Sequence, residues 1–512
     1  MKRLLFFLLI IPFHIALAQP GVLDYSFGTA GIAFGPYTTQ YSYAYGIAQQ
    51  QDGKVVVTGY LQDTTLSTFV TRFDTNGVVD PTFSNPILVI GQLGDYGRAI
   101  TVQPDGKILI TGFADNTSTD IYVARLLSSG ELDSTFGTGG IVMTDFGNNT
   151  LDHVHDMTLQ PDGKILITGW VLDQDINIAL LRYNTDGTLD STFGVNGKVS
   201  TDIDSTTQEA YSVVVQPDGK ILVAGYTSTP LFGDNLVVIR YLTDGSIDFS
   251  FGINGISMPA INQDNDGAYD MALQPDGKIV LGGYSYTVIP FGDNLVVRLD
   301  STGDLDPSFG GTGVVTTDFT NNDSYATGVL IQPDGKIITT GRATSATSDF
   351  LLTRFKADGQ LDSTFGTNGF RLTSVATGED YIYGSLLQPD GKVVVAGYYS
   401  DNLIENFAVA RYNSDSSFNV SVTGNYKNDI MVYPQPAGDE LFVKYNAATS
   451  GNKPEVNIYN VVGEKFLCEA DHSISGRNQS MLKISCGFLD PGVYVLEVID
   501  GGANFRVKIL KD

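Results

Sequence analysis

Two histidines separated by one residue, His153 and His155, are the side chains of this chain best suited to metal or acid–base chemistry. On a β-strand, residues i and i+2 face the same side, so the two imidazoles could approach one metal ion. Structural zinc needs about four ligands, and the corresponding positions of the other repeats, described below, carry no histidine. The pattern favours an ordinary surface or packing role and no metal site.

Several loops are rich in carboxylate and amide oxygens, the ligands that Ca²⁺ prefers. None of them matches a full twelve-residue Ca²⁺ loop, so solvated turns are the favoured interpretation and Ca²⁺ binding stays an open alternative. The loops are Asp264-Asn265-Asp266-Gly267, Asp202-Ile203-Asp204 and Asn321-Asn322-Asp323.

No set of nucleophile, base and orienting residue stands out, and the chain has neither a Gly-x-Ser-x-Gly elbow nor a glycine-rich phosphate loop. Catalysis by paired Asp or Glu carboxylates stays open. The near-uniformity of the repeats argues against it, because an active site normally breaks the symmetry. We therefore predict no catalytic, cofactor-binding or metal-binding residues.

Cys468 and Cys486 are the only cysteines and both lie near the C-terminus. In an exported protein they could form a disulfide bond, which requires Cα atoms within about 7 Å of each other. Two buried free thiols are the alternative.

A repeat dominates the chain. A Gln-Pro-Asp-Gly-Lys turn recurs every 53 to 58 residues, with Gln51 in place of Pro in the first copy. Pro, Asp and Gly at these positions are typical of a type I turn. An apolar run after each turn predicts a strand covered on both faces, and the stretch before it predicts a hairpin partner. The turn aspartates are Asp52, Asp105, Asp162, Asp218, Asp276, Asp334 and Asp390.

A third predicted strand of each repeat ends in Arg, and a Leu-Asp-x-x-Phe-Gly motif follows a second turn. In the six repeats that hold both residues in order, eight residues separate this Arg from the Asp of the motif. The pair could form a partly buried ion pair, or the Asp could cap backbone N–H groups, and the sequence leaves both open. The arginines are Arg72, Arg125, Arg182, Arg240, Arg298, Arg354 and Arg411.

With a fourth strand after the motif, each repeat has the plan of a propeller blade, and seven repeats predict a seven-bladed β-propeller. A β-helix is the alternative, although its coils are usually shorter. The first copy of the motif, Leu23 to Gly28, precedes the first turn, and the last Arg has no motif after it. We therefore expect the ring to close by strand exchange, with residues 22–36 pairing near Arg411 and Asp24 beside Arg411.

Two segments of the repeat vary in length: the connection between blades and the loop between the second and third strands. In a propeller both lie on one face, while the two constant turns lie on the other. Because loops on a rigid scaffold usually carry binding, we expect a ligand to contact this variable face.

Residues 1–18 are typical of a secretory signal peptide, with Lys2 and Arg3, an apolar stretch and an Ala-Leu-Ala end. Pro12 and His14 make the stretch too short for a transmembrane anchor. The formal net charge is −27, and without the signal peptide it is −29. Such a charge argues against nucleic-acid and membrane-surface binding.

The repeat resembles the delta-60 repeat of bacterial surface and secreted proteins over residues 22–418, on the motifs Leu-Asp-Ser-Thr-Phe-Gly, Gln-Pro-Asp-Gly-Lys and Arg-Tyr. The second motif copy departs from it, because Ser84-Asn85-Pro86 follows Phe83. This departure puts the regularity of that blade in question.

The C-terminal part, on motifs such as Val432-Tyr433-Pro434-Gln435-Pro436 and Leu489-Asp490-Pro491-Gly492, resembles the type A sorting domain of the type IX secretion system. Its alternating strands predict a small β-sandwich. The resemblance implies export across both membranes of a Bacteroidota-type cell, with the secretion machinery as partner. The predicted domains are the signal peptide (1–18), the propeller (19–425) and the sandwich (426–512).

These observations predict a monomeric, secreted or cell-surface propeller that binds an unidentified protein or glycan without catalysis. The alternative is an extracellular hydrolase or lyase that acts on polysaccharide with acidic residues at the propeller mouth. Carboxylates from a few blades lining a deep pocket would favour the enzyme, and a flat face rich in loops would favour binding.

Overall fold

We describe the fold from a computed structural model of the chain, which divides into two compact units, Met1–Ser417 and Phe418–Asp512. In the first unit the structure describes residues 20–414 except 38, 148–150, 204–206, 230–232, 262–264, 289–290, 320–321 and 402–403. In the second it describes the strands given below and residue 489. Among the described residues no helix is long and apolar enough to cross a membrane.

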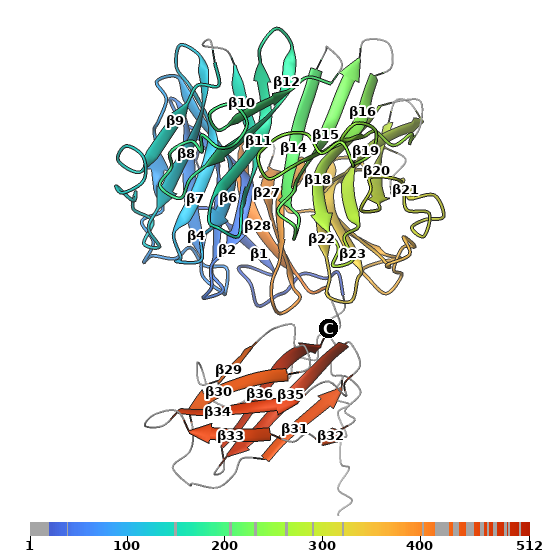
Figure 1. Cartoon of the computed structure of the whole chain (residues 1–512). Coiled ribbons are helices and arrows are strands. Elements are labelled where there is room, and N and C mark those ends of the chain that lie inside the picture. The colour runs from blue at the N-terminus through green and yellow to red at the C-terminus, as the bar shows by residue number, and fades with distance from the viewer. Residues whose placement is uncertain are drawn as a thin grey trace, which may run out of the picture. The chain divides into compact units, whose positions relative to one another are not determined.

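The first unit is the predicted seven-bladed β-propeller (Figure 1). Each blade is an antiparallel sheet whose first strand is innermost. The first strands are β2 (Tyr41–Gln49), β6 (Gly94–Val102), β10 (Asp152–Leu159), β14 (Thr207–Val215), β18 (Asp266–Leu273), β22 (Ser324–Ile331) and β26 (Asp380–Leu387). The second strands are β3 (Val55–Gln62), β7 (Ile108–Asp115), β11 (Ile165–Leu172), β15 (Ile221–Thr229), β19 (Ile279–Val288), β23 (Ile337–Thr344) and β27 (Val393–Ser400).

The third strand of each blade carries the conserved Arg near its end, and the fourth is short. The third strands are β4 (Leu66–Phe73), β8 (Thr119–Leu126), β12 (Ile176–Tyr183), β16 (Gly233–Tyr241), β20 (Phe291–Leu299), β24 (Ser348–Phe355) and β28 (Glu405–Tyr412). The fourth strands are β5 (Ile87–Leu88), β9 (Ile141–Thr144), β13 (Lys198–Thr201), β17 (Ile256–Ser257), β21 (Val314–Thr317), β25 (Phe370–Thr373) and, for the last blade, β1 (Ile32–Phe34). A single parallel pairing, Ile176 with Thr207, links the third and fourth blades.

Strand exchange closes the ring as predicted. β1 pairs antiparallel with β28, with Ile32 opposite Ala410, so the N-terminal segment supplies the outer strand of the last blade. Seven apolar layers separate neighbouring blades, and the layer between the last and first blades contains the fully buried Phe27 and Phe407. No blade-to-blade interface is therefore left open.

The two interpretations of the Arg and Asp motif are both confirmed, because the two carboxylate oxygens have different partners. In all seven blades the Arg Nε lies 2.7–2.9 Å from the Asp Oδ2. The Asp Oδ1 accepts the backbone N–H of the residue two positions later at 2.8–3.2 Å. The Phe of the motif lies under the guanidinium, 4.3–4.9 Å from its carbon.

The same guanidinium also joins each blade to the next. Arg125 Nη1 donates to the carbonyl oxygen of Thr185 in the following blade at 2.6 Å. Across the ring closure, Arg411 donates to the carbonyl oxygen of Thr75 at 2.8 Å and pairs with Asp24. We call this set of Arg, Asp and Phe the blade staple.

The blade with the irregular motif keeps the fold. Ser84 replaces the usual Gly, but its N–H still donates to the carbonyl oxygen of Ser129 in the next blade at 2.9 Å. Asn85 adopts a φ of 47°, and its side-chain oxygen accepts the N–H of Arg72. β5 has two residues, as does β17 in a blade with the regular motif.

The second unit consists of two four-stranded antiparallel sheets, as expected for the small sandwich. Its described core residues, such as Leu441, Ile458 and Leu496, are fully buried. Cys468 and Cys486 lie outside the described residues, so their pairing stays a prediction. The sheets are β29 (Ile430–Tyr433), β30 (Glu440–Asn446), β34 (Gln479–Ser485) and β33 (Ala470–Ile474), and β32 (Lys465–Leu467), β31 (Glu455–Asn460), β35 (Gly492–Asp500) and β36 (Ala503–Lys511).

Asp24→Ala tests the ring closure. Burial opposes ionisation of Asp24, but hydrogen bonds from Ser26 and Lys392 and the charge of Arg411 lower its pKa to about 2. Removing this partner leaves Arg411 buried without its counter-ion, so we expect the unfolding free energy to fall by about 3 kcal/mol in chemical denaturation at pH 7. The deficit should shrink as the pH falls from about 4 towards 2, where wild-type Asp24 also becomes neutral.

Asp63→Ala is the matched control, because Asp63 is an exposed loop aspartate of the first blade. Its effect should stay within about 0.5 kcal/mol. Equal effects of the two substitutions would contradict closure through the staple.

Candidate functional site

Each inner strand contains a β-bulge seven residues before its turn Asp. In the first blade Ala44 pairs with Gly59 and Gly46 with Thr58, so Tyr45 has no partner on β3. The same shift of register occurs in every blade. Bulges are frequent beside binding sites because they redirect a side chain. The seven bulged residues, which we call the bulge ring, are Tyr45, Arg98, His155, Tyr211, Tyr269, Thr327 and Tyr383.

The bulge explains the invariant Gly of the second strand. At Gly59 an added Cβ would overlap the carbonyl oxygen of Tyr43, and the equivalent glycines of all blades meet the equivalent carbonyl in the same way. Only a residue without a side chain fits there. The Gly is therefore a sequence signal for the bulge.

Aromatic residues surround the channel beside the bulge ring. They occupy the position two residues before the bulge in five blades and the position after the second-strand Gly in six blades, both in the half of the blade nearer the variable loops. Rings from neighbouring positions have centroids 3.9–6.0 Å apart. This aromatic belt comprises Tyr43, Tyr60, Tyr96, Phe113, His153, Trp170, Tyr226, Tyr284, Tyr325, Tyr381 and Tyr398.

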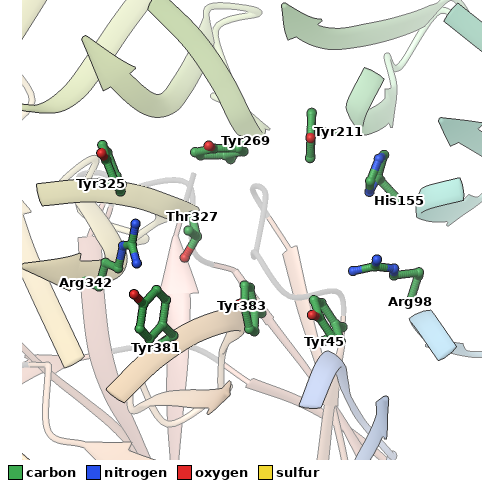
Figure 2. Close-up of a pocket in the computed structure, with 10 residues that line it drawn as sticks. All are labelled: Tyr45, Arg98, His155, Tyr211, Tyr269, Tyr325, Thr327, Arg342, Tyr381 and Tyr383. Carbon is green, nitrogen blue, oxygen red and sulfur yellow. The ribbon is translucent and has the colours of Figure 1, made fainter. Parts of the chain in front are cut away.

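The bulge ring and part of the belt enclose a cavity of about 380 Å³. Figure 2 shows the lining side chains, with Arg342 and Arg98 on opposite sides. A cavity of this size accommodates a small molecule or the end of a chain-like ligand. Its lining residues are Tyr45, Arg98, His155, Tyr211, Tyr269, Tyr325, Thr327, Arg342, Tyr381 and Tyr383.

His155 and Tyr211 line one wall of the cavity, and Glu209 contacts both of them. The Tyr211 hydroxyl donates to the Glu209 carboxylate at 2.8 Å, and the His155 ring stacks on Tyr211 with centroids 4.2 Å apart. His155 Nε2 lies 3.7 Å from Glu209 Oε2. Burial lowers the pKa of His155, so the imidazole is neutral at pH 7 and the contact is not an ion pair.

Two carboxylates, Asp156 and Asp270, line the channel next to the bulge ring. Burial raises the pKa of Asp156 to about 7 and that of Asp270 to about 6. Each bridges neighbouring blades, because Asp156 Oδ2 accepts the N–H of Val213 and Asp270 Oδ2 accepts that of Val329. Their other oxygens accept the N–H of the next residue in the chain. All four carboxylate oxygens thus have backbone partners.

The two histidines considered as a metal pair have different surroundings. His153 is stacked between Phe113 and Trp170, with centroids 3.9 and 4.1 Å away, whereas His155 belongs to the bulge ring. Burial and the neighbouring His155 lower the pKa of His153 to about 4.

In the Asp- and Asn-rich loops, Asn265 and Asp323 accept backbone N–H groups, and Asp202 accepts the side-chain amide of Gln208. Asn265 Oδ1 accepts the N–H of Asp234, and Asp323 Oδ1 accepts the N–H of Gly292. These two side chains therefore stabilise the β15–β16 and β19–β20 hairpins. Asp204, Asp264 and Asn321 lie outside the described residues.

A separate acidic cluster, Asp120, Asp145 and Asp152, has ligand atoms within 4.8 Å of one another. The buried Asp152 accepts the N–H of Phe146 and orders its own loop. This cluster was not predicted from the sequence.

Binding was expected on the variable loops, yet the cavity is lined by strand residues. The lining residues were not predicted from the sequence because they resemble ordinary inner-strand positions. Aligning the repeats at seven residues before the turn Asp, and at the residue after the second-strand Gly, would have revealed two columns of aromatic and basic side chains.

Comparison with family models decides the identity. The domain of unknown function (DUF5122) beta-propeller matches seven times, and the secretion system C-terminal sorting domain matches residues 431–512. The chain is a DUF5122 β-propeller protein with a type IX sorting domain. It is therefore a secreted or cell-surface protein. The propeller matches cover residues 50–83, 103–136, 160–193, 216–251, 274–309, 332–365 and 388–421.

Comparison with curated proteins finds no match. Among solved structures, a protein of unknown function from Dyadobacter fermentans is 13% identical, with 75% of this chain and 98% of that chain covered and a TM-score of 0.42. A polysaccharide lyase of family PL25, an ulvan lyase in complex with a saccharide, is 11% identical, with 78% and 95% covered and a TM-score of 0.43. TM-scores this low carry no conclusion about the DUF5122 protein.

Asp156→Ala tests the channel carboxylates through pH. Because the pKa of Asp156 is raised to about 7, the folded state retains a proton that the unfolded chain releases above about pH 4. Wild-type stability should therefore lose a contribution on the order of 3 to 4 kcal/mol as the pH rises from 4 to 7. The Asp156→Ala variant should not lose this contribution. The unfolding free energy of the variant minus that of wild type should therefore rise between pH 4 and pH 7 and stay constant at higher pH.

Ala is suited to the test because the second blade carries Ala99 at the same position. Denaturant titrations at several pH values give the measurement. A variant that tracks wild type at every pH would contradict the raised pKa.

Deletion of residues 428–512 tests the sorting domain. We expect the remaining propeller to fold and to accumulate in the periplasm, because the signal read by the outer-membrane machinery is gone. Cell fractionation with immunodetection measures the distribution, and the intact chain is the control. Normal amounts of truncated protein in the medium would contradict the sorting role.

Proposed function

We propose that this exported propeller is a non-enzymatic binding protein that takes a glycan into its central channel. The aromatic belt around a cavity of about 380 Å³ is the observation that carries the proposal. Sugar rings have apolar C–H faces that pack against aromatic rings, and their hydroxyls hydrogen-bond with tyrosine hydroxyls and guanidinium groups. The cavity offers both kinds of group around one space.

A glycan fits this site better than a folded protein does. Protein interfaces bury broad surfaces of about 800 Å² on each partner, whereas the polar and aromatic groups here converge inside a channel. The net charge of −27 disfavours nucleic acid. A single sugar unit or a chain end matches the volume of the cavity.

The hydrolase or lyase alternative is supported by one observation, the carboxylates of Asp156 and Asp270 with pKa values of about 7 and 6 in the channel. Their oxygens already accept backbone N–H groups, which favours a structural role. New reducing ends or unsaturated products released from a bound polysaccharide by wild type, and not by Asp156→Ala, would establish the enzyme instead.

Trp170 provides the readout for binding, because it is the only tryptophan of the chain and belongs to the belt. We expect a saturable change in its fluorescence when a binding oligosaccharide is titrated into the mature protein. Tyr211→Ala should weaken binding at least tenfold, since it removes a ring that stacks on His155 and lies 5.2 Å from Tyr269.

Tyr25→Ala is the matched control, because Tyr25 is 74% exposed and is not among the cavity residues. Its dissociation constant should equal that of wild type. Thermal melting of both variants shows that they are folded. No response of Trp170 to any member of a broad oligosaccharide panel would overturn the proposal.

A further inference from the structure

We infer that the ligand of the central cavity is acidic, a glycan whose carboxylate or sulfate groups are bound by Arg98 and Arg342. This inference rests on the proposed function and names the chemical class of the glycan. It is carried by the unusual surroundings of the two guanidinium groups.

Both guanidinium groups are held by aromatic rings and not by carboxylates. The Arg342 guanidinium lies 4.1 and 4.8 Å from the ring centres of Tyr381 and Tyr325. That of Arg98 lies 4.3 Å from the ring centre of Tyr45, and its Nε is buried with no hydrogen-bond partner. Cation–π contacts fix the position of a guanidinium while leaving its in-plane N–H donors free.

The staple arginines show what this chain does with a guanidinium that has only a structural role. The guanidinium of Arg125, for example, donates hydrogen bonds to Asp133, Thr135 and Thr185, so its N–H groups are engaged by partners within the protein. Within the part of the chain that the structure describes, the guanidinium groups of Arg98 and Arg342 form no ion pair and donate no hydrogen bond. In a chain with a net charge of −27, two cations without carboxylate partners in one cavity are best explained by a ligand that brings the anions.

Both arginines are also exceptions to the repeat. The residue after the second-strand Gly is aromatic in the other six blades, and Arg342 alone departs from this. The bulge position is aromatic or Thr in the other blades, and Arg98 is its only cation at pH 7, because His155 is neutral. Packing of the repeat does not demand arginine at either position.

The placement of the arginines indicates how the ligand lies. They come from the second and sixth blades and approach the cavity from opposite sides, as Figure 2 shows. Asp156 and Asp270 line the channel beyond the bulge ring, where an anionic group would be repelled. The acidic groups of the ligand should therefore remain at the level of the two arginines.

The repeat supplies substitutions that suit the fold, Arg98→Tyr and Arg342→Tyr, because tyrosine occupies both positions in other blades. Lys356→Gln is the control for loss of one positive charge, since Lys356 is exposed in a constant turn. The probes are oligogalacturonate, which carries carboxylates, a carrageenan oligosaccharide, which carries sulfates, and a neutral cello-oligosaccharide. Calorimetry with the mature full-length chain gives the affinities, and thermal melting reports folding.

We expect wild type to bind at least one acidic probe at least tenfold more tightly than the neutral probe, and the acidic probe preferred shows whether carboxylate or sulfate is recognised. Each arginine variant should lose at least tenfold for that probe, and Lys356→Gln should lose nothing. Equal affinities of wild type for acidic and neutral probes, or arginine variants that bind like wild type, would overturn the inference and leave glycan binding standing. Absence of binding to all glycans would overturn both proposals.

Discussion

The arginine at the end of each third strand forms the interaction on which the rest of the propeller depends. Its guanidinium pairs with the Asp of the motif, which lies eight residues later in six of the seven blades, covers a Phe, and donates to a carbonyl of the following blade. A buried cation is costly unless its donors are satisfied, and here they are satisfied partly by the neighbouring blade. Each blade therefore needs the next one.

This dependence explains why the ring is closed by its two ends. The last blade obtains its Asp from the N-terminal segment, and Arg411 reaches forward to Thr75 of the first blade. The seven apolar layers between blades are then all covered. Because the staples lie near the constant turns, the ring does not depend on particular residues at the inner-strand positions. These positions can therefore differ from blade to blade.

Variation inside the ring is concentrated at the bulges. A bulge forces Gly onto the second strand and turns one side chain per blade towards the channel. The outer positions of the repeat are almost uniform, but the bulge ring holds Tyr, Arg, His and Thr. Besides the loops of variable length and the irregular motif at Ser84, the repeat departs from uniformity at channel-facing positions, where a ligand could contact it. Such departures give a repeated scaffold specificity. The sorting domain directs this DUF5122 protein to the cell surface or the medium. There we expect the channel to be the part that binds a ligand.

The sequence by itself determined the seven blades, the closure through Asp24 and Arg411, the C-terminal sandwich and export, because each depends on local motifs repeated at fixed spacing. It also contained the second-strand Gly, but not the reason for it. Only the tertiary structure decided that Tyr45, Arg98 and five equivalent residues converge, since a bulge shifts register between paired strands and leaves no mark in a single strand's pattern. It also decided that the cavity is lined by strands and not by the variable loops, because lining residues of different blades, 39 or more positions apart in sequence, meet only when the ring is closed.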